Sequence, residues 1–333
     1  MAVADDQDVR SITIAAGRLS ATILNVGAAL MDFAVDMQGG RRPLILSLSD
    51  ANAYRTNPHY LGAIAGRCAN RIRGGACIID GRLHQLDRNE NGETHLHGGP
   101  KGFSRKFWNI VAHTPESVDL ALHSPDTDQG YPGNLDCTCR YELLPGNRMR
   151  ITLSATADAT TLVNLAAHAY FTLAPQSSVL DHALQIAAEH YTPVDANLIP
   201  DGRQLAVRGT GFDFTSLSRI GTQREGTPAG FDHNFILAGA PRHEPAFAAR
   251  LRSPLQDLSL EIWTTEPGLQ FYDGAKLQGD PTNPSGTLRP FAGCCLEPQR
   301  FPDAIHHPHF AGALLPAGAV YRQVTEYRVH AGS

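Results

Sequence analysis

Residues 148–158 read RMRITLSATAD, in which the apolar Met149, Ile151 and Leu153 alternate with arginine and threonine. Successive side chains of a β-strand point to opposite faces of a sheet, so this alternation predicts a half-buried strand. Residues 258–265, LSLEIWTT, repeat the pattern, with leucine and isoleucine on one face and serine and glutamate on the other. Three further segments have the composition of strands: 118–124, 138–144 and 269–274.

Glycine and proline interrupt the rest of the chain at short intervals, since the 333 residues include 31 glycines and 22 prolines. Long stretches with a helical period are missing, and no repeat, low-complexity tract or change of composition marks a domain boundary. Many short strands with turn-rich connections are typical of sandwiches and barrels. We therefore predict an all-β protein whose residues 1–333 form one domain, a large antiparallel β-sandwich. Helix should be limited to short turns such as residues 301–307.

The charge balance argues against several classes of partner. The 28 basic and 33 acidic residues give a net charge of -5, and no basic run interleaves with aromatic residues, so we expect no nucleic-acid partner. No apolar run approaches the roughly 18 residues of a membrane span. The N-terminus carries three aspartates where a signal peptide would be basic and then apolar. We therefore expect no membrane partner and a cytoplasmic location.

The six cysteines form no CxxC pair, which argues against zinc-ribbon and thioredoxin-like sites. Cys137 and Cys139 could share one strand face and join a metal site, although burial as small apolar side chains is the more common role. We expect all six cysteines to be reduced and structural.

Two histidines precede a pair of glycines in residues 93–103, ETHLHGGPKGF. On one strand His95 and His97 would share a face, which fits a metal site, an acid/base site or a buried core. A metal site of the cupin kind would need a glutamate a few residues later, where this chain reads GGPKGF. We expect Gly98 and Gly99 to keep side chains away from a ligand that His97 faces, with His95 at the rim or packed beneath.

Two glycine-rich segments match known binding loops only in part. Residues 61–75 lack both GxGxxG and GK[ST] spacing, which disfavours nucleotide binding. The adjacent Asn70 and Arg71 in this segment could bind the hydroxyls of a polar ligand, or Arg71 could be a solvated residue on a turn. Residues 126–135 are acidic but lack the glutamate that ends an EF-hand, so we expect a structural loop.

Single ionisable residues at strand ends are further candidates. His168 lies in an apolar segment, Asp232 precedes a buried strand, and Glu297 stands between an apolar run and a proline. A carboxylate facing a cleft can act as a base, although core histidines and solvated carboxylates are common alternatives. The histidines after Glu297 are expected in an exposed loop where an adventitious metal site is conceivable: His306, His307 and His309.

Taken in order, these stretches form six blocks, spread from about residue 57 to residue 303. They are Gly66, Arg67, Ala69, Asn70, Arg71 and Ile72; HLHGG at 95–99 with Gly102, Phe103 and Trp108; Gly130, Tyr131, Pro132 and Gly133; Asn164, His168, Tyr170 and Phe171; Asp232, His233, Asn234 and Phe235; and Leu296, Glu297, Gln299, Phe301, Pro302 and Asp303. In residue type and order this set resembles the aldose 1-epimerases, or galactose mutarotases.

The resemblance implies a large antiparallel supersandwich that interconverts the α and β anomers of a free aldose. It implies a general base at Glu297, a general acid at His168 and a second active-site histidine at His97. The sugar-positioning residues it implies are Asn70, Arg71, Asp232 and Gln270. No metal or cofactor is needed, the partner is a monosaccharide such as galactose or glucose, and the assembly is expected to be a monomer or homodimer.

Mutarotation requires one group to remove the anomeric hydroxyl proton while another protonates the ring oxygen, so a base and an acid must flank one carbon. Two alternatives stay open. Glu297 and Asp232 could be the paired carboxylates of a glycoside-cleaving enzyme, or the protein could bind sugars without catalysis. The residues flanking His168 are Ala167 and Ala169, where relatives commonly carry polar side chains, so hydrogen bonds that orient His168 must come from elsewhere.

Overall fold

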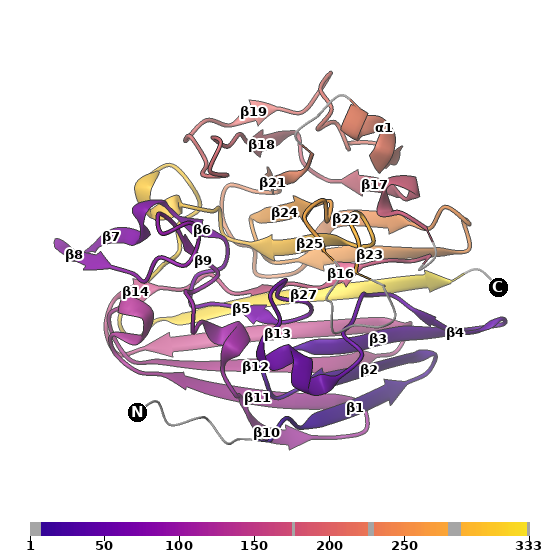
Figure 1. Cartoon of the computed structure of the whole chain (residues 1–333), viewed down its shortest axis with the longest axis horizontal. Helices are drawn as coiled ribbons and strands as arrows, with labels where there is room; N and C mark the ends of the chain where they lie inside the picture. The colour runs from indigo at the N-terminus through magenta and orange to yellow at the C-terminus, as the bar shows by residue number, and fades with distance from the viewer. Residues whose placement is uncertain (1–7, 175–176, 226–229, 279–287, 332–333) are drawn as a thin grey trace.

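The computed structural model of the chain describes residues 8–174, 177–225, 230–278 and 288–331. Every pairing between its named strands is antiparallel, and the described residues contain one short α-helix, α1 (Ile220–Glu225). This confirms the predicted all-β class and the large antiparallel sandwich (Figure 1). No helix in the described part of the chain is long and apolar enough to cross a membrane.

The largest sheet has nine strands. In spatial order they are β10 (Asn109–His113), β11 (Ser117–Ser124), β12 (Leu135–Leu144), β13 (Arg148–Ala157), β27 (Val320–Ala331), β23 (Leu258–Thr264), β22 (Ala246–Arg252), β17 (Ala183–Ile186) and β20 (Ser218–Arg219). The two stretches with the clearest alternation are therefore strands β13 and β23, as predicted. Glu261 was expected on the exposed face of β23, but it is buried beside Arg250 of the neighbouring strand, with which it forms an ion pair at 2.6 Å.

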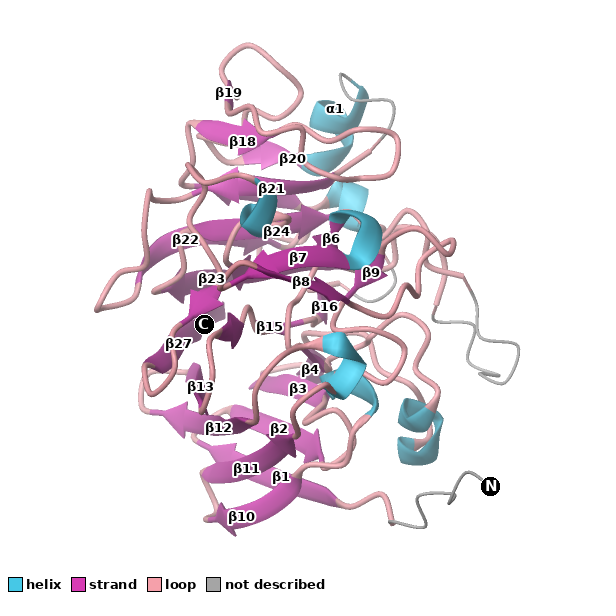
Figure 2. Ribbon diagram, turned by 90° about the vertical axis from the view of Figure 1, so that its left-hand side faces the viewer, coloured by secondary structure: helices cyan, strands magenta, loops and turns pink. Residues whose placement is uncertain are grey.

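Two smaller sheets pack on this large sheet. A six-stranded sheet contains β16 (Tyr170–Phe171), β25 (Cys294–Gln299), β24 (Gly268–Tyr272), β21 (Asp232–Ile236), β18 (His190–Thr192) and β19 (Leu205–Ala206). A four-stranded sheet contains β1 (Ser11–Ala16), β2 (Leu19–Leu24), β3 (Leu30–Met37) and β4 (Gly40–Pro43). The six-stranded sheet lies near β22 and β23, and the four-stranded sheet lies near β10 to β13 (Figures 1 and 2). One main core of buried apolar side chains joins all three sheets.

Four short strand pairs complete the fold. They are β5 (Ile64–Ala65) with β15 (Ala166–Ala167), β6 (Arg71–Ile72) with β9 (His95–Leu96), β7 (Ala76–Ile79) with β8 (Arg82–Gln85), and β14 (Thr161–Leu162) with β26 (Leu314–Leu315). The pair of β6 and β9 brings the segment of Asn70 and Arg71 beside that of His97. The helical turn predicted in 301–307 is present at Ala304–His306.

Several local predictions can be compared directly with this fold. All six cysteines are buried and free, with Cys137 and Cys139 in the main core, as expected for structural thiols. The acidic loop at 126–135 uses its carboxylates internally, since Asp128 pairs with Lys106 at 2.9 Å and Asp126 accepts the Gly133 N–H at 2.6 Å. The structural-loop interpretation is therefore confirmed.

Candidate active site

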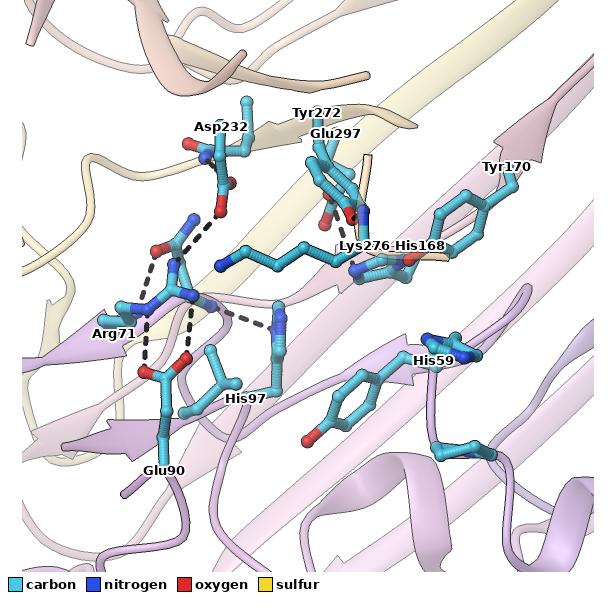
Figure 3. A pocket seen from close by; sticks show the side chains of 15 residues that line it. His59, Arg71, Glu90, His97, His168, Tyr170, Asp232, Tyr272, Lys276 and Glu297 are labelled. Atoms are coloured by element: carbon cyan, nitrogen blue, oxygen red, sulfur yellow. Dashed lines mark hydrogen bonds and ion pairs between the residues drawn. The ribbon is translucent and has the colours of Figure 1, made fainter. Parts of the chain in front are cut away.

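A pocket of about 180 Å³ opens beside the six-stranded sheet (Figure 3). This volume lies below the roughly 300–1,000 Å³ of pockets for drug-sized ligands, which favours a ligand of about one sugar ring. The seven residues predicted to act on or bind a sugar all line its wall: Asn70, Arg71, His97, His168, Asp232, Gln270 and Glu297. The fold thus collects these widely separated residues into one cavity.

Strands β25, β24 and β21 provide one wall of this cavity. Side chains alternate between the two faces of a sheet, so every second residue of each strand points toward the pocket side. That face carries Glu297 and Cys295 from β25, Gln270 and Tyr272 from β24, and Asp232 from β21. The register places Glu297 beside Gln270, and Tyr272 between Cys295 and Asp232. The intervening residues belong to the main core: Leu296, Phe271 and Phe235.

His97 and Asn70 hold each other in place. The Asn70 N–H donates to Nδ1 of His97 at 3.2 Å, and the His97 N–H donates to the Asn70 carbonyl at 3.0 Å. Because Nδ1 accepts a hydrogen bond, the neutral ring carries its proton on Nε2. Burial, with the neighbouring His168 and Arg71, holds the pKa of His97 well below its usual range. His97 is therefore an N–H donor to the pocket at neutral pH.

Arg71 is a buried cation held by two carboxylates. Its Nε and Nη2 each donate to an oxygen of Glu90 at 2.8 Å, and its Nη1 lies 3.6 Å from Oδ2 of Asp232. Burial alone would lower the pKa of Arg71, but Asp232 and Glu90 outweigh burial and raise this pKa. Asp232 also accepts a bond from Nε2 of Gln270 at 2.7 Å. The alternative of a solvated arginine is wrong, since the Arg71 side chain is only 8% exposed.

Glu297 and His168 face each other, with Oε1 of the carboxyl 3.7 Å from Nε2 of the ring. Burial, reinforced by the charge of Asp232, raises the pKa of Glu297 well above its usual range. Burial lowers the pKa of His168 to about 4. At a pH between these two pKa values the pair therefore shares one proton, which resides on the carboxyl. Oε2 of Glu297 and Oε1 of Gln270 have no hydrogen-bond partner among the described residues, so both can accept from a ligand.

His95 and His97 do not face one spot, contrary to the expectation for two residues of one strand. Strand β9 ends at Leu96, and His97 adopts a positive φ of 50°. The ring of His97 lines the pocket, whereas His95 is fully buried and its Nε2 lies 2.7 Å from the Tyr131 hydroxyl. The two rings therefore do not form an HxH metal site, and His95 packs beneath the pocket.

Gly98 and Gly99 do not line the pocket, so the role predicted for them is wrong. Gly98 has a φ of +84°, and a Cβ there would overlap the carbonyl of Gly66. At Gly99, with a φ of +92°, a Cβ would lie 2.8 Å from Oε1 of Gln129. These glycines allow the chain after His97 to pack closely against neighbouring segments.

The histidine loop after Glu297 lies outside the pocket. His306 and His309 are exposed, as expected, whereas His307 is half-buried. Nδ1 of His306 lies 2.7 Å from the Asp303 carboxylate, and Nε2 of His309 lies 2.7 Å from the Gly202 carbonyl. These contacts anchor the loop to its neighbours.

Other residues of the pocket were not predicted from the sequence. Tyr60 lies against His97, with ring centroids 4.6 Å apart, and Glu90 anchors Arg71. Lys276 is exposed and also lines the wall. Glu90 and Lys276 lie in loops without a recognisable motif, so no sequence signal marks them. Tyr272 could have been found, because it follows Gln270 by two residues and shares its face.

One cluster in the described residues brings three possible metal-ligand side chains close together. The ligand atoms of His168, Cys295 and Glu297 lie within 4.8 Å of one another. Burial raises the pKa of both the Cys295 thiol and the Glu297 carboxyl, so a metal ion would have to displace a proton from each.

The family of this chain is identified by comparison with known proteins. The pattern that defines the aldose 1-epimerase family matches residues 10–328. The chain belongs to the aldose 1-epimerase family. As a member of this family it is an isomerase that interconverts the anomers of an aldose, as the sequence predicted.

Relatives of this aldose 1-epimerase match it over nearly their whole length. The galactose mutarotase of Bos taurus is 37% identical over 329 residues, covering 96% of this chain and 94% of the relative. The aldose 1-epimerase of Escherichia coli strain K12 is 36% identical over 335 residues, covering 97% and 96%. These relatives give no support to the glycoside-cleaving or non-catalytic alternatives.

Solved structures agree with the family assignment. The galactose 1-epimerase of Lactobacillus acidophilus NCFM superposes with a TM-score of 0.86 at 29% identity, covering 100% of this chain and 98% of that one. An aldose epimerase homologue from C. elegans gives a TM-score of 0.90 at 27% identity, covering 98% and 100%. The predicted supersandwich fold is thereby confirmed.

Proposed function

We propose that the pocket opens and recloses the ring of a free aldose by proton transfer, with Glu297 as the base and His168 as the acid. The observation that carries this proposal is the 3.7 Å approach of their side chains inside a buried pocket. A sugar whose anomeric carbon lies between them presents its anomeric hydroxyl to Glu297 and its ring oxygen to Nε2 of His168.

The reaction moves two protons and breaks one ring bond. Carboxylate Glu297 takes the proton of the anomeric hydroxyl, and the electrons of that O–H bond form the aldehyde C=O. The C1–O5 bond breaks, and O5 receives its proton from Nε2 of His168. Rotation about C1–C2 and the reverse transfers close the ring on the other face. The pair of Glu297 and His168 holds one proton in both the resting and the active form. Activation therefore requires only that this proton moves from Glu297 to His168.

The remaining residues position the sugar. The Arg71 guanidinium, held by Glu90 and Asp232, presents a fixed set of donors to sugar hydroxyls. Nε2 of His97 is a further N–H donor, and the free Oε1 of Gln270 is an acceptor. Asp232 already contacts Arg71 and Gln270, so it is better suited to binding the sugar than to acting as a second catalytic carboxylate. Asn70, whose Oδ1 accepts the Arg71 N–H, has its amide N–H₂ available for a hydroxyl.

The same proposal covers substrate, assembly and location. The curated relatives are named galactose mutarotases and aldose 1-epimerases, which favours galactose or glucose as the substrate. The reduced, buried cysteines are typical of a cytoplasmic protein. We propose that the protein works there as a monomer or homodimer.

The proposed reaction is tested by NMR exchange between the anomeric protons of equilibrated galactose. The protein should transfer magnetisation between the α and β signals, and Glu297→Gln and His168→Asn should each abolish this transfer. In the same tube an added alkyl galactoside should stay intact. Release of free galactose from the glycoside, or exchange undiminished in both variants, would contradict the proposal.

A further inference from the structure

The ring of His168 must be held in one orientation if Nε2 is to serve the substrate. Its chain neighbours cannot do this, because Ala167 and Ala169 have no polar side-chain atoms. Its backbone is fixed, since its N–H donates to the Ala63 carbonyl at 2.9 Å. The side chain needs a separate partner at Nδ1, the nitrogen that faces away from Glu297.

That partner is the thiol of Cys295. Its Sγ lies 3.5 Å from Nδ1 of His168, within hydrogen-bond range for sulfur. Cys295 is fully buried on strand β25, two residues before Glu297 and on the same face. Strand pairing with Tyr170 and Tyr272 on its two sides fixes its backbone. Burial also raises the thiol pKa well above its usual range, so the sulfur keeps its proton and stays uncharged.

We propose that Cys295 is a positioning residue of the epimerase, whose sulfur accepts the Nδ1–H of His168 and thereby keeps Nε2 as the working nitrogen. This inference rests on the proposed role of His168 as the acid. A single strand then fixes both halves of the acid–base pair, because β25 carries the base at Glu297 and the anchor of the acid at Cys295.

The Nε2 side of the His168 ring determines which atom donates in the hydrogen bond between Nδ1 and the Cys295 sulfur. Oε1 of Glu297 lies 3.7 Å from Nε2, so the proton that moves during the proposed reaction is on this side of the ring, and the ring proton that stays is on Nδ1. After Nε2 gains a proton, Nδ1–H remains in place. The sulfur can therefore accept from the same N–H in the neutral and protonated rings, and no reorganisation is needed during turnover.

Alanine and serine variants test this inference. Cys295→Ala should lower kcat about 10-fold with KM changed less than about 2-fold, the effect of losing one hydrogen bond that orients a reacting group. Cys295→Ser keeps a donor and acceptor and should recover most of this loss. The matched control is Cys294→Ala on the same strand, since the Cys294 side chain is buried in the main core and should leave kcat unchanged. If Cys295→Ala does not fold, Cys295→Val fills the space without a polar atom and makes the same test.

A second readout separates orientation from packing. Nitrogen-15 NMR of the His168 ring should show the Nδ1–H form in the wild type and a mixture of both forms in Cys295→Ala. A wild-type kcat and ring spectrum in Cys295→Ala, with His168→Asn inactive, would overturn the role of Cys295 and leave the acid in place. A fully active His168→Asn would overturn the proposed acid and this inference with it.

Discussion

Replacing Glu297 by Gln removes the proposed base but keeps the size of the side chain. General base catalysis contributes about 10²- to 10⁴-fold to a rate, so kcat should fall by at least about 10²-fold. KM should change little, because the hydrogen bonds proposed between the sugar and Arg71, His97 and Gln270 do not involve Glu297. The measurement is the initial rate of anomer interconversion by polarimetry, corrected for the spontaneous rate.

The same substitution should not destabilise the fold. Glu297 is only 2% exposed, and its Oε2 has no hydrogen-bond partner among the described residues. Its pKa is raised in the folded state, so its stabilising contribution is present below the ordinary glutamate pKa and is lost as pH rises through the raised value. Relative to the wild type, Glu297→Gln should therefore gain stability as pH rises above the ordinary glutamate pKa, as measured by urea unfolding.

A matched control is available in Glu266, which is also fully buried, with burial raising its pKa to about 7, and which pairs with Arg300 outside the pocket. Glu266→Gln should keep kcat within about 3-fold of the wild type, since Glu266 does not line the pocket. Wild-type kcat in Glu297→Gln would rule out Glu297 as the base. A fall of its unfolding free energy by more than about 2 kcal/mol at neutral pH would contradict the predicted gain in stability.

Three further outcomes follow from the same geometry. Arg71→Lys should raise KM about 10-fold in steady-state assays, because an ammonium cannot keep the two-point bond to Glu90 and still reach the sugar. The value of kcat/KM should rise as pH increases through about 4, the pKa of His168, because the pair then changes from two protons to one. It should fall again as pH passes the raised pKa of Glu297, where the last proton is lost. A flat pH profile would contradict a pair that shares one proton. His95→Gln should lower the unfolding free energy by about 1–3 kcal/mol through loss of its bond to Tyr131, with kcat/KM within about 3-fold, as chemical denaturation and polarimetry would show.

Strand alternation made much of this protein predictable. The patterns at 148–158 and 258–265 correspond to β13 and β23, because a half-buried sheet imposes a period of two on its residues. The resemblance to aldose 1-epimerases then placed all seven candidate residues in what proved to be one pocket. Their individual roles, and the organisation of residues 1–333 as one domain, stay predictions.

Other features depend on tertiary contacts that alternation does not encode. The period of two failed at His97, because β9 ends one residue earlier and the positive φ of His97 turns its ring away from that of His95. Glu90 could not be chosen from its neighbours, since its bond to Arg71 spans 19 residues of chain. The contact between Cys295 and His168 spans 127 residues and appears only when β16 pairs with β25.

Polarimetry of freshly dissolved α-D-galactose and α-D-glucose at neutral pH measures directly whether the protein interconverts sugar anomers. Optical rotation should reach its equilibrium value faster with the wild-type protein than without it, and Glu297→Gln should restore the spontaneous rate. A folded wild-type protein that accelerates neither sugar would rule out mutarotation of galactose and glucose, and an equal acceleration by Glu297→Gln would rule out Glu297 as the base.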